Sequence, residues 1–423
     1  MKILHTADIH VGYKTHGTID PKSGLNSRLA DFERCFRYMV DHAIEEQVDL
    51  VLFCGDAYRD MNPSQTDQRI FARCLKPLLD RDIPVVMIVG NHDHPYTLGK
   101  VNSMEIFSLF SDFIHLFRQC ESRDIMTKSG LVRIIGLPWP MIHDFRTREE
   151  FAALSKEEQH ERVHQMYADF ISAEAGRLKE HRVDYPVILA GHLHVESAVM
   201  TEGSERVTMV TRDPVFRLSM LQRPEFDYVA MGHIHKYQTL GAGKRPPVVY
   251  AGSIERISFA EADQEKGFVM IGISGGKKVT YRHIPTPART MTPIEIDVRN
   301  DEDPMTSILE RIRNIPLDQA IVRVAIVCKG DQKNLVDIRD VRKALQQSFI
   351  IAGINLKVEQ ELSRSRVPGL HRNLSTREAL EMYVEHNRHL LPLREKILDA
   401  ARILEEECEE ESDGKGAELT EEQ

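Results

Sequence analysis

Five short apolar runs lie within the first 231 residues of the chain, and each leads into a polar residue. They are rich in Val, Ile and Leu, and they span Lys2–Thr6, Val48–Cys54, Ile83–Val89, Tyr185–Ala190 and Phe226–Met231. Continuous apolar runs of this length predict β-strands that are buried on both faces. The pattern therefore predicts a buried sheet, and one sheet could carry all five runs.

Amphipathic stretches alternate with these runs. Apolar side chains recur at helical spacing from Asp31 to Glu46, and Gln65 to Arg81 and Ser155 to His181 are predicted as two further helices. Ordinary packing against the sheet accounts for all three. Strands that alternate with helices are typical of the α/β class, which is the fold class we expect for residues 1–284.

The pattern changes after residue 284, where Pro285, Pro287 and Pro293 indicate a linker. Three strand-like runs then alternate with two helical stretches, which predicts a small α/β domain over residues 285–367. The strand-like runs are 294–298, 321–327 and 356–361, and the helical stretches lie near 305–313 and 338–349.

Two short amphipathic helices are predicted in residues 368–404. Ser375 and Glu378 have the spacing of a capping box at the start of the first helix, and Pro392 can begin the second. The Glu-rich residues 405–423 are predicted to be a disordered tail. Because this tail carries ten acidic residues and one Lys, the other 404 residues hold a net charge of only about −1 (−10 less −9).

The composition indicates which broad class of protein this chain belongs to. A chain of 423 residues can hold two or three domains, and 42% hydrophobic with 28% charged residues is typical of a soluble globular protein. No window approaches the roughly 18 consecutive apolar residues of a membrane helix. The first residues lack the apolar stretch of a signal peptide, and the six cysteines show no CxxC spacing. We therefore expect a cytoplasmic protein with reduced thiols.

The polar residues that end the apolar runs are of the types that bind metal ions. They are Asp8, His10, Asp56, Asn91, His92, Asp93, His192, His194, His233 and His235. Ligands gather at the carboxyl ends of strands in open α/β sheets, and the neighbouring glycines allow sharp turns there. Carboxylate, amide and imidazole groups suit divalent ions such as Mn²⁺. Histidines that only cap strand ends are the alternative, but capping does not explain why Asp, Asn and His converge.

Such a set predicts a two-metal site that hydrolyses phosphodiesters. Two ions about 3.5–4 Å apart stabilise the attacking and the leaving oxygen of an in-line displacement. With these motifs the chain resembles the calcineurin-like metallophosphoesterases and, within them, the SbcD-type double-strand-break-repair nucleases. The narrower resemblance rests on the opening residues 1–10, the run Ile135–Trp139 and the layout after residue 285, and it extends to about residue 405.

The resemblance implies a β-sandwich flanked by helices, with a capping domain at 285–367, a partner-binding helical segment at 368–404 and an acidic tail at 405–423. It also implies two Mn²⁺ ions, with Mg²⁺ or another divalent ion as alternatives. The ligands that it implies are Asp8, His10 and His235 for the first ion and Asn91, His192 and His233 for the second, with Asp56 bridging both. His92 would be the catalytic histidine, and Asp93 would hold it in position.

Three residues are left without an assigned role. His94 and His194 are expected to lie near the ligands or at the surface rather than on the metals. Arg59 stands where members of the family often have His or Asp. It could contact a substrate phosphate or be an ordinary exposed arginine.

The resemblance implies a DNA nuclease of a repair complex, with exonuclease activity on duplex ends and endonuclease activity on hairpin or blocked ends. It implies an SMC-like ATPase partner, called SbcC in bacteria, bound through residues 371–404, and a homodimer within a heterotetramer at the nucleoid. No P-loop motif occurs in this chain, so ATP dependence would come from the partner. The rival functions are a phosphodiesterase or phosphatase for other substrates, and a non-enzymatic tether for DNA ends.

Overall fold

The computed structural model describes residues 1–94, 101–140, 154–201, 214–241, 243–359 and 375–404. The chain divides into two compact units. The first is made of Met1–Ile294, Ile315–Val324 and Arg342–Gly353, and the second of Glu295–Asn314, Ala325–Val341 and Ile354–Gln423. The domain division at residues 284, 367 and 404 stays a prediction.

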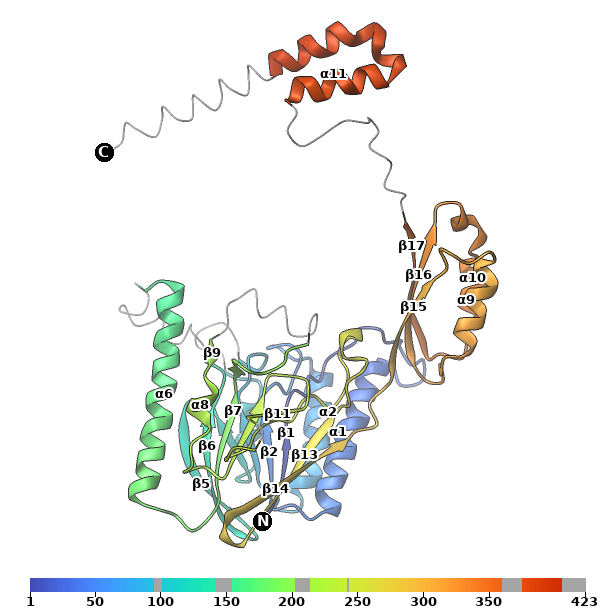
Figure 1. Ribbon diagram of the computed structural model, residues 1–423. Helices are drawn as coiled ribbons and strands as arrows, with labels where there is room; N and C mark the ends of the chain where they lie inside the picture. The colour runs from blue at the N-terminus through green and yellow to red at the C-terminus, as the bar shows by residue number, and fades with distance from the viewer. Residues whose placement is uncertain (95–100, 141–153, 202–213, 242, 360–374, 405–423) are drawn as a thin grey trace, which may run out of the picture. The chain divides into compact units, whose positions relative to one another are not determined.

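The first sheet has six strands, and its central part is parallel (Figure 1). Its order is β14 (Lys278–Pro285), β13 (Gly267–Ser274), β1 (Lys2–Thr6), β2 (Leu50–Cys54), β3 (Val85–Ile88) and β4 (Ile114–Phe117). Strands β1 to β4 run parallel, whereas β13 and β14 are antiparallel additions at one edge. Helices α1 (Ser27–Glu45) and α2 (Gln65–Leu79) cover its outer face, where Phe36 and Phe71 pack in one core with Val51 and Phe53.

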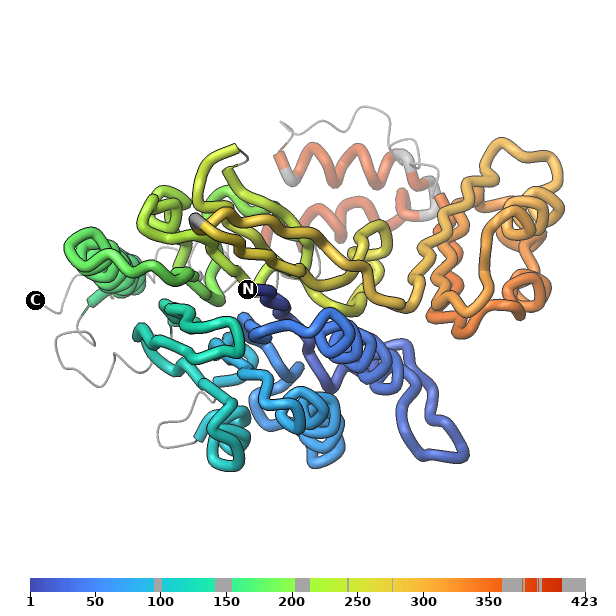
Figure 2. The backbone as a smooth tube through the Cα atoms, turned by 90° about the horizontal axis from the view of Figure 1, so that it is seen from below, coloured from blue at the N-terminus to red at the C-terminus, as the bar shows by residue number. Residues whose placement is uncertain are grey.

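The second sheet also has six strands. Its order is β11 (Gln238–Leu240), β12 (Val248–Tyr250), β10 (Tyr228–Gly232), β7 (Val187–His192), β6 (Gly130–Leu137) and β5 (Glu121–Thr127). The four central strands are parallel and the two edge strands are antiparallel. Helix α6 (Lys156–Glu180) packs on the outer face through Val163, Tyr167 and Ile171. Figures 1 and 2 both show α6 on the other side of the sheets from α1 and α2.

The two sheets pack face to face around a shared apolar core. Leu52 of β2 lies in this core with Ile188 of β7 and Ala230 of β10, whereas Val51 and Phe53 face the helices. This confirms the β-sandwich flanked by helices. The expectation that one sheet carries all five apolar runs is wrong, because the runs of β1, β2 and β3 lie in the first sheet and those of β7 and β10 in the second.

The three predicted helices of this region are confirmed, and their starts have local causes. Helix α1 begins at Ser27, four residues before the expected start, because the side chain of Asn26 accepts a hydrogen bond from the amide of Arg28. Helices α2 and α6 begin at capping boxes, at Ser64 and Ser155.

A separate three-stranded sheet follows residue 290. Its order is β15 (Met291–Asp297), β16 (Ile321–Lys329) and β17 (Ile350–Glu359), with helices α9 (Pro304–Arg313) and α10 (Ile338–Ala344) between the strands in sequence. The predicted strands and helices of this region are thus confirmed, although β17 begins six residues before the predicted 356 and α10 ends at Ala344 rather than at 349. The shorter elements of the chain are α3 (Glu105–Ser108), β8 (His194–Val195), β9 (Val215–Phe216), α8 (Leu218–Leu221), η1 (Phe259–Glu261), η2 (Gly275–Lys277) and η3 (Gln332–Leu335).

The C-terminal segment is helical, as expected. Helix α11 (Thr376–His386) begins at the capping box of Ser375 and Glu378, and η4 (Arg388–Leu393) leads into helical residues 394–404. The predicted disordered tail lies outside the described residues. Within the described part, five cysteines are free thiols, and no helix has the length and apolar character needed to span a membrane.

Candidate metal centre

The loops that follow five parallel strands meet at one rim of the sandwich. Asp8 and His10 follow β1, Asp56 follows β2, Asn91 and His92 follow β3, His192 ends β7, and His233 and His235 follow β10. Backbone hydrogen bonds join the first two loops, since the amides of Asp8 and His10 donate to the carbonyls of Gly55 and Asp56, at 3.0 Å each. The rim therefore collects residues that lie more than two hundred positions apart.

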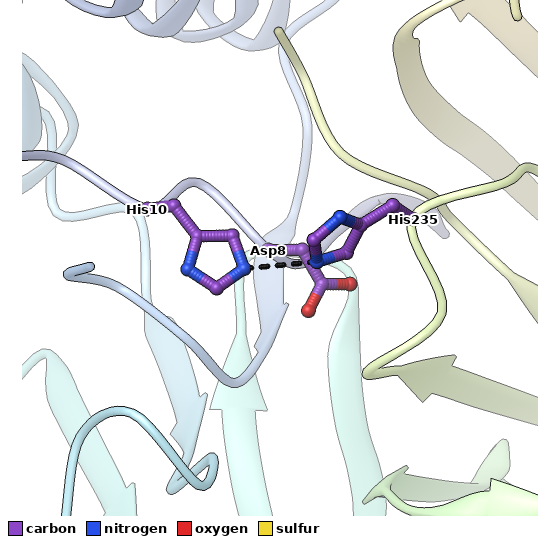
Figure 3. Close-up of side chains that lie close together, drawn as sticks. All are labelled: Asp8, His10 and His235. Atoms are coloured by element: carbon purple, nitrogen blue, oxygen red, sulfur yellow. Dashed lines mark hydrogen bonds between the residues drawn. The ribbon is translucent and has the colours of Figure 1, made fainter. Parts of the chain in front are cut away.

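Asp8, His10 and His235 form a first cluster of ligand atoms (Figure 3). One ligand atom from each lies within 4.8 Å of the others. The Nε2 atoms of His10 and His235 are 3.0 Å apart, so both imidazoles point at the same small space. All three side chains are buried.

Asn91, His192 and His233 form a second cluster, and Asp56 lies between the two. The side-chain oxygen of Asn91 is 3.0 Å from Nε2 of His192 and 3.2 Å from Nδ1 of His233. Oδ1 of Asp56 is 3.4 Å from Nε2 of His192, and its Oδ2 is 3.6 Å from Nε2 of His10. Each oxygen of this carboxylate thus faces one cluster.

Fixed hydrogen bonds aim three of the imidazoles. Nδ1 of His192 lies 2.7 Å from the carbonyl of Cys54, Nδ1 of His92 lies 2.6 Å from the carbonyl of Arg59, and Nδ1 of His235 lies 2.9 Å from a carboxylate oxygen of Glu261. These partners only accept, so each Nδ1 carries a proton and Nε2 is the nitrogen of each ring that faces the clusters. Several lone pairs that converge with two carboxylates fit divalent cations.

Asp93 has a different task from the predicted one. Its carboxylate accepts hydrogen bonds from the amides of Asp56 (2.8 Å), Ala57 (2.8 Å) and Gly90 (2.9 Å). It therefore fixes the loop that carries Asp56, whereas the backbone carbonyl of Arg59 orients His92. The expected pairing of Asp93 with His92 is corrected accordingly. The family resemblance implied that pairing, but neighbouring side chains on a turn need not face each other.

The charges of the site follow from burial and from close partners. Burial disfavours a charged Asp56, but the facing His192 and His92 outweigh it and hold the pKa of Asp56 well below its usual value. Burial also opposes the charge on His192, yet Asp56 raises the pKa of His192 to about 9. Burial lowers the pKa of His10 and of His233 well below the usual value, so both are neutral and able to act as ligands.

The backbone of the site is unusual. Asp8, His10, Asp56 and His233 all have positive φ, at 52°, 50°, 59° and 92°. Non-glycine residues seldom adopt this region, and such strain concentrates at functional sites. Space is equally tight at Gly90, where an added Cβ would stand 2.1 Å from Oδ1 of Asp56.

The three residues left open lie around these clusters. His194 is half-buried with its ring 6.3 Å from that of His233, and neither it nor His94 belongs to the ligand clusters found among the described residues. Arg59 contributes its carbonyl to His92, and its guanidinium lies 4.7 Å from the ring centre of Tyr13. Tyr13 in turn packs edge-on against His10.

Sequence reasoning missed several residues that support the site. Glu261 holds His235, and the buried ammonium of Lys266 lies 2.9 Å from Glu261. Trp139, the only tryptophan of the chain, has its ring 4.7 Å from that of His233. No motif marks Glu261 or Lys266, and Trp139 belongs to a run that was quoted for the resemblance alone and was given no role at the site. Only a general rule could have suggested that such residues exist: histidines that bind metals usually donate their other N–H to a carboxylate or carbonyl.

Comparison with known proteins agrees with this geometry. The pattern of calcineurin-like phosphoesterases matches residues 1–237, more than half of the chain. The chain belongs to this family. It is 27% identical to the SbcD subunit of the nuclease SbcCD of Staphylococcus epidermidis over 70% of this chain and 73% of that protein. The predicted resemblance to SbcD-type nucleases is thereby confirmed.

Two further relatives match a larger share of this chain. The SbcD subunit of the nuclease SbcCD of Escherichia coli K12 is 24% identical over 87% of both chains. The DNA double-strand break repair protein Mre11 of Methanocaldococcus jannaschii is 22% identical over 90% of this chain and 98% of its own length. The similarity therefore extends beyond the phosphoesterase region.

Proposed function

We propose that this calcineurin-like phosphoesterase is a metal-dependent DNA nuclease of a repair complex. The position of Asp56 carries the proposal, because one of its carboxylate oxygens faces His10 of the first cluster and the other faces His192 of the second. A carboxylate in that place would hold two cations close together despite their repulsion. The similarity to proteins named as nuclease subunits and as a double-strand break repair protein supports DNA as the substrate.

The ligand roles follow the two clusters. Asp8, His10 and His235 would hold one ion, Asn91, His192 and His233 the other, and Asp56 both. Bound Mn²⁺, or Mg²⁺ in its place, would lower the pKa of a water and stabilise the charge that develops on a phosphodiester. The remaining chemistry belongs to the side chains around the ions.

His92 is the proposed catalytic residue. Its side chain is 36% exposed, while Asp56 and the other histidines of the clusters are buried, so His92 can reach a phosphate that approaches from solvent. Its Nε2 lies 4.0 Å from Oδ2 of Asp56, and the carbonyl of Arg59 keeps the ring in that orientation. An imidazole in this place can deliver a proton to the leaving 3′ oxygen.

Cleavage of DNA tests this function. Wild type should degrade end-labelled duplex DNA from its ends and open hairpin DNA when Mn²⁺ is added. His92→Ala should slow both reactions by on the order of 10²–10⁴-fold while it still binds Mn²⁺. His181→Ala, at an exposed histidine after α6, is the matched control and should cleave normally.

Two results would count against the proposal. Full activity of His92→Ala would remove the catalytic role of that residue. If wild type cleaves no DNA, even with an SMC-like ATPase and ATP, but turns over small phosphodiesters, the chain is a phosphoesterase for other substrates.

An SMC-like ATPase is the proposed partner of residues 371–404. The C-terminal helices expose apolar side chains that need a covering surface, at Tyr383, Leu391, Leu393, Ile403 and Leu404. The names of the relatives as subunits of SbcCD support an SbcC-like protein. Deletion of residues 371–423 should abolish ATPase binding in a pull-down and spare Mn²⁺-dependent cleavage, and an intact complex after the deletion would contradict the assignment.

A homodimer of this chain within a heterotetramer with the ATPase is proposed as well. Exposed apolar side chains gather around α3, at Val101, Ile106, Leu109 and Phe110, and Phe110 is 82% exposed. Phe110→Asp should therefore give a monomer in sedimentation velocity, whereas Phe110→Leu should remain a dimer. A dimer that survives Phe110→Asp would place the contact elsewhere. With DNA as its substrate, the complex would work at the nucleoid.

A further inference from the structure

Behind His235 lies a group of buried polar side chains that belongs to neither ligand cluster. Nδ1 of His235 donates to Oε1 of Glu261 at 2.9 Å. The other oxygen, Oε2, lies 2.9 Å from Nζ of Lys266 and accepts from the amide of Ile257 at 3.0 Å. The side chains of Glu261 and Lys266 have no exposed surface.

Lys266 uses its donors on three different acceptors. Besides Glu261, its ammonium contacts the side-chain oxygen of Gln264 at 2.9 Å and the backbone carbonyl of His235 at 3.1 Å. An ammonium group has three N–H donors, and these contacts account for all three. His235 is thus held twice, through its ring by Glu261 and through its backbone by Lys266.

A buried ion pair of this kind is a costly way to stabilise a fold. Removing two charges from water is costly, and apolar residues of similar volume are often as stabilising or more so. The geometry points instead to positioning, because Glu261 dictates which nitrogen of His235 carries the proton. With the proton on Nδ1, the lone pair of Nε2 faces Asp8 and His10.

We propose that Glu261 is a positioning residue for the metal centre, that it acts by fixing the proton and the ring of His235, and that Lys266 is the countercharge that allows its burial. The inference rests on the proposed metal site and deepens it. Glu261 belongs to neither cluster, so its effect must pass through His235. The half of the centre that contains Asn91 and His192 is not expected to depend on it.

A matched pair of double variants isolates the hydrogen bond. Glu261→Gln with Lys266→Met removes both charges and keeps an acceptor for Nδ1 of His235. Glu261→Leu with Lys266→Met removes the charges and the acceptor. Removing both charges together avoids a variant that leaves Lys266 buried without its partner, which would destabilise the fold for an unrelated reason.

Titration calorimetry with Mn²⁺ is the readout, and thermal unfolding checks that both proteins are folded. The Leu variant should bind one of two Mn²⁺ ions about 10- to 100-fold more weakly, and the Gln variant should stay close to wild type. Glu255→Gln is a control for the loss of a buried carboxylate, because Glu255 accepts from the amide of Arg289 and contacts no ligand histidine, and its two affinities should not change.

Three outcomes decide the matter. Loss in the Leu variant alone supports the positioning role. Equal affinities in both variants, whether unchanged or equally weakened, overturn it, because the hydrogen bond would then make no difference. Failure of the wild type to bind Mn²⁺ at all would instead overturn the metal site on which the proposed function rests.

Discussion

The two halves of the proposed metal centre are supported in different ways. In the half with Asp8 and His10, a buried carboxylate on a distant loop holds His235. In the half with Asn91, a backbone carbonyl at the end of β2 holds His192. A backbone support depends on the course of the strands, whereas a side-chain support can be lost through one substitution. Metal binding by the half that contains His235 is therefore more sensitive to substitutions outside the ligand set.

Substitution of Asp56, which faces both halves of the centre, should reduce Mn²⁺ binding and DNA cleavage more than any other change. Asp56→Ala deletes the carboxylate that faces both clusters, so both Mn²⁺ ions should bind weakly and DNA cleavage should fall by on the order of 10³-fold or more. Calorimetry and a cleavage assay on the same preparation measure the two effects. Retention of two tightly bound ions would show that Asp56 does not join the halves.

Single-ligand variants should separate the halves. His192→Ala and His235→Ala each remove one imidazole, so each should reduce the number of tightly bound Mn²⁺ ions from two to one, and cleavage should fall by on the order of 10²-fold or more in both. Metal content after dialysis gives the stoichiometry. If either substitution removed both ions, the halves would not be separable and the comparison would fail.

A glycine beneath Asp56 offers a smaller perturbation. Gly90→Ala would place a Cβ 2.1 Å from Oδ1 and 2.5 Å from the backbone nitrogen of Asp56, so both the carboxylate and the backbone of Asp56 have to shift and Mn²⁺ affinity should drop about tenfold. Gly176→Ala is the control, because its Cβ meets nothing within 4 Å inside α6 and should stabilise the fold by about 0.5–1 kcal/mol. Mn²⁺ titrations and urea unfolding measure the two effects, and unchanged Mn²⁺ affinity in Gly90→Ala would mean that the rim is not tightly packed.

Much of the fold could be predicted because burial leaves a local pattern. The runs of β2 and β7 are apolar on both faces, and the capping boxes at Ser155 and Ser375 mark where helices begin. The pattern could not show that these strands belong to two sheets. A strand such as β2 looks the same in sequence whether its second face meets a helix or another sheet.

The ligand types were predictable for a similar reason, because they closely follow apolar runs, and a glycine comes directly after four of the five runs. The residues that hold these ligands in position could not be predicted. Glu261 lies 26 positions beyond His235 in a short 3₁₀ turn, and only the folded chain brings the two together. The support of His92 is a backbone carbonyl, that of Arg59, and a carbonyl leaves no trace in the sequence. The role of Asp93 was predicted wrongly, because the resemblance implied that it holds His92, whereas its carboxylate accepts from the backbone amides of Asp56, Ala57 and Gly90.

Anomalous diffraction from crystals grown with Mn²⁺ is the most direct test of a metal centre shared through Asp56. We expect two peaks about 3.5–4 Å apart, with the carboxylate of Asp56 contacting both and His92 contacting neither. One peak should lie beside Asp8 and His235, and the other beside Asn91 and His192. A single ion, or two ions that Asp56 does not share, would contradict a two-metal centre in this chain.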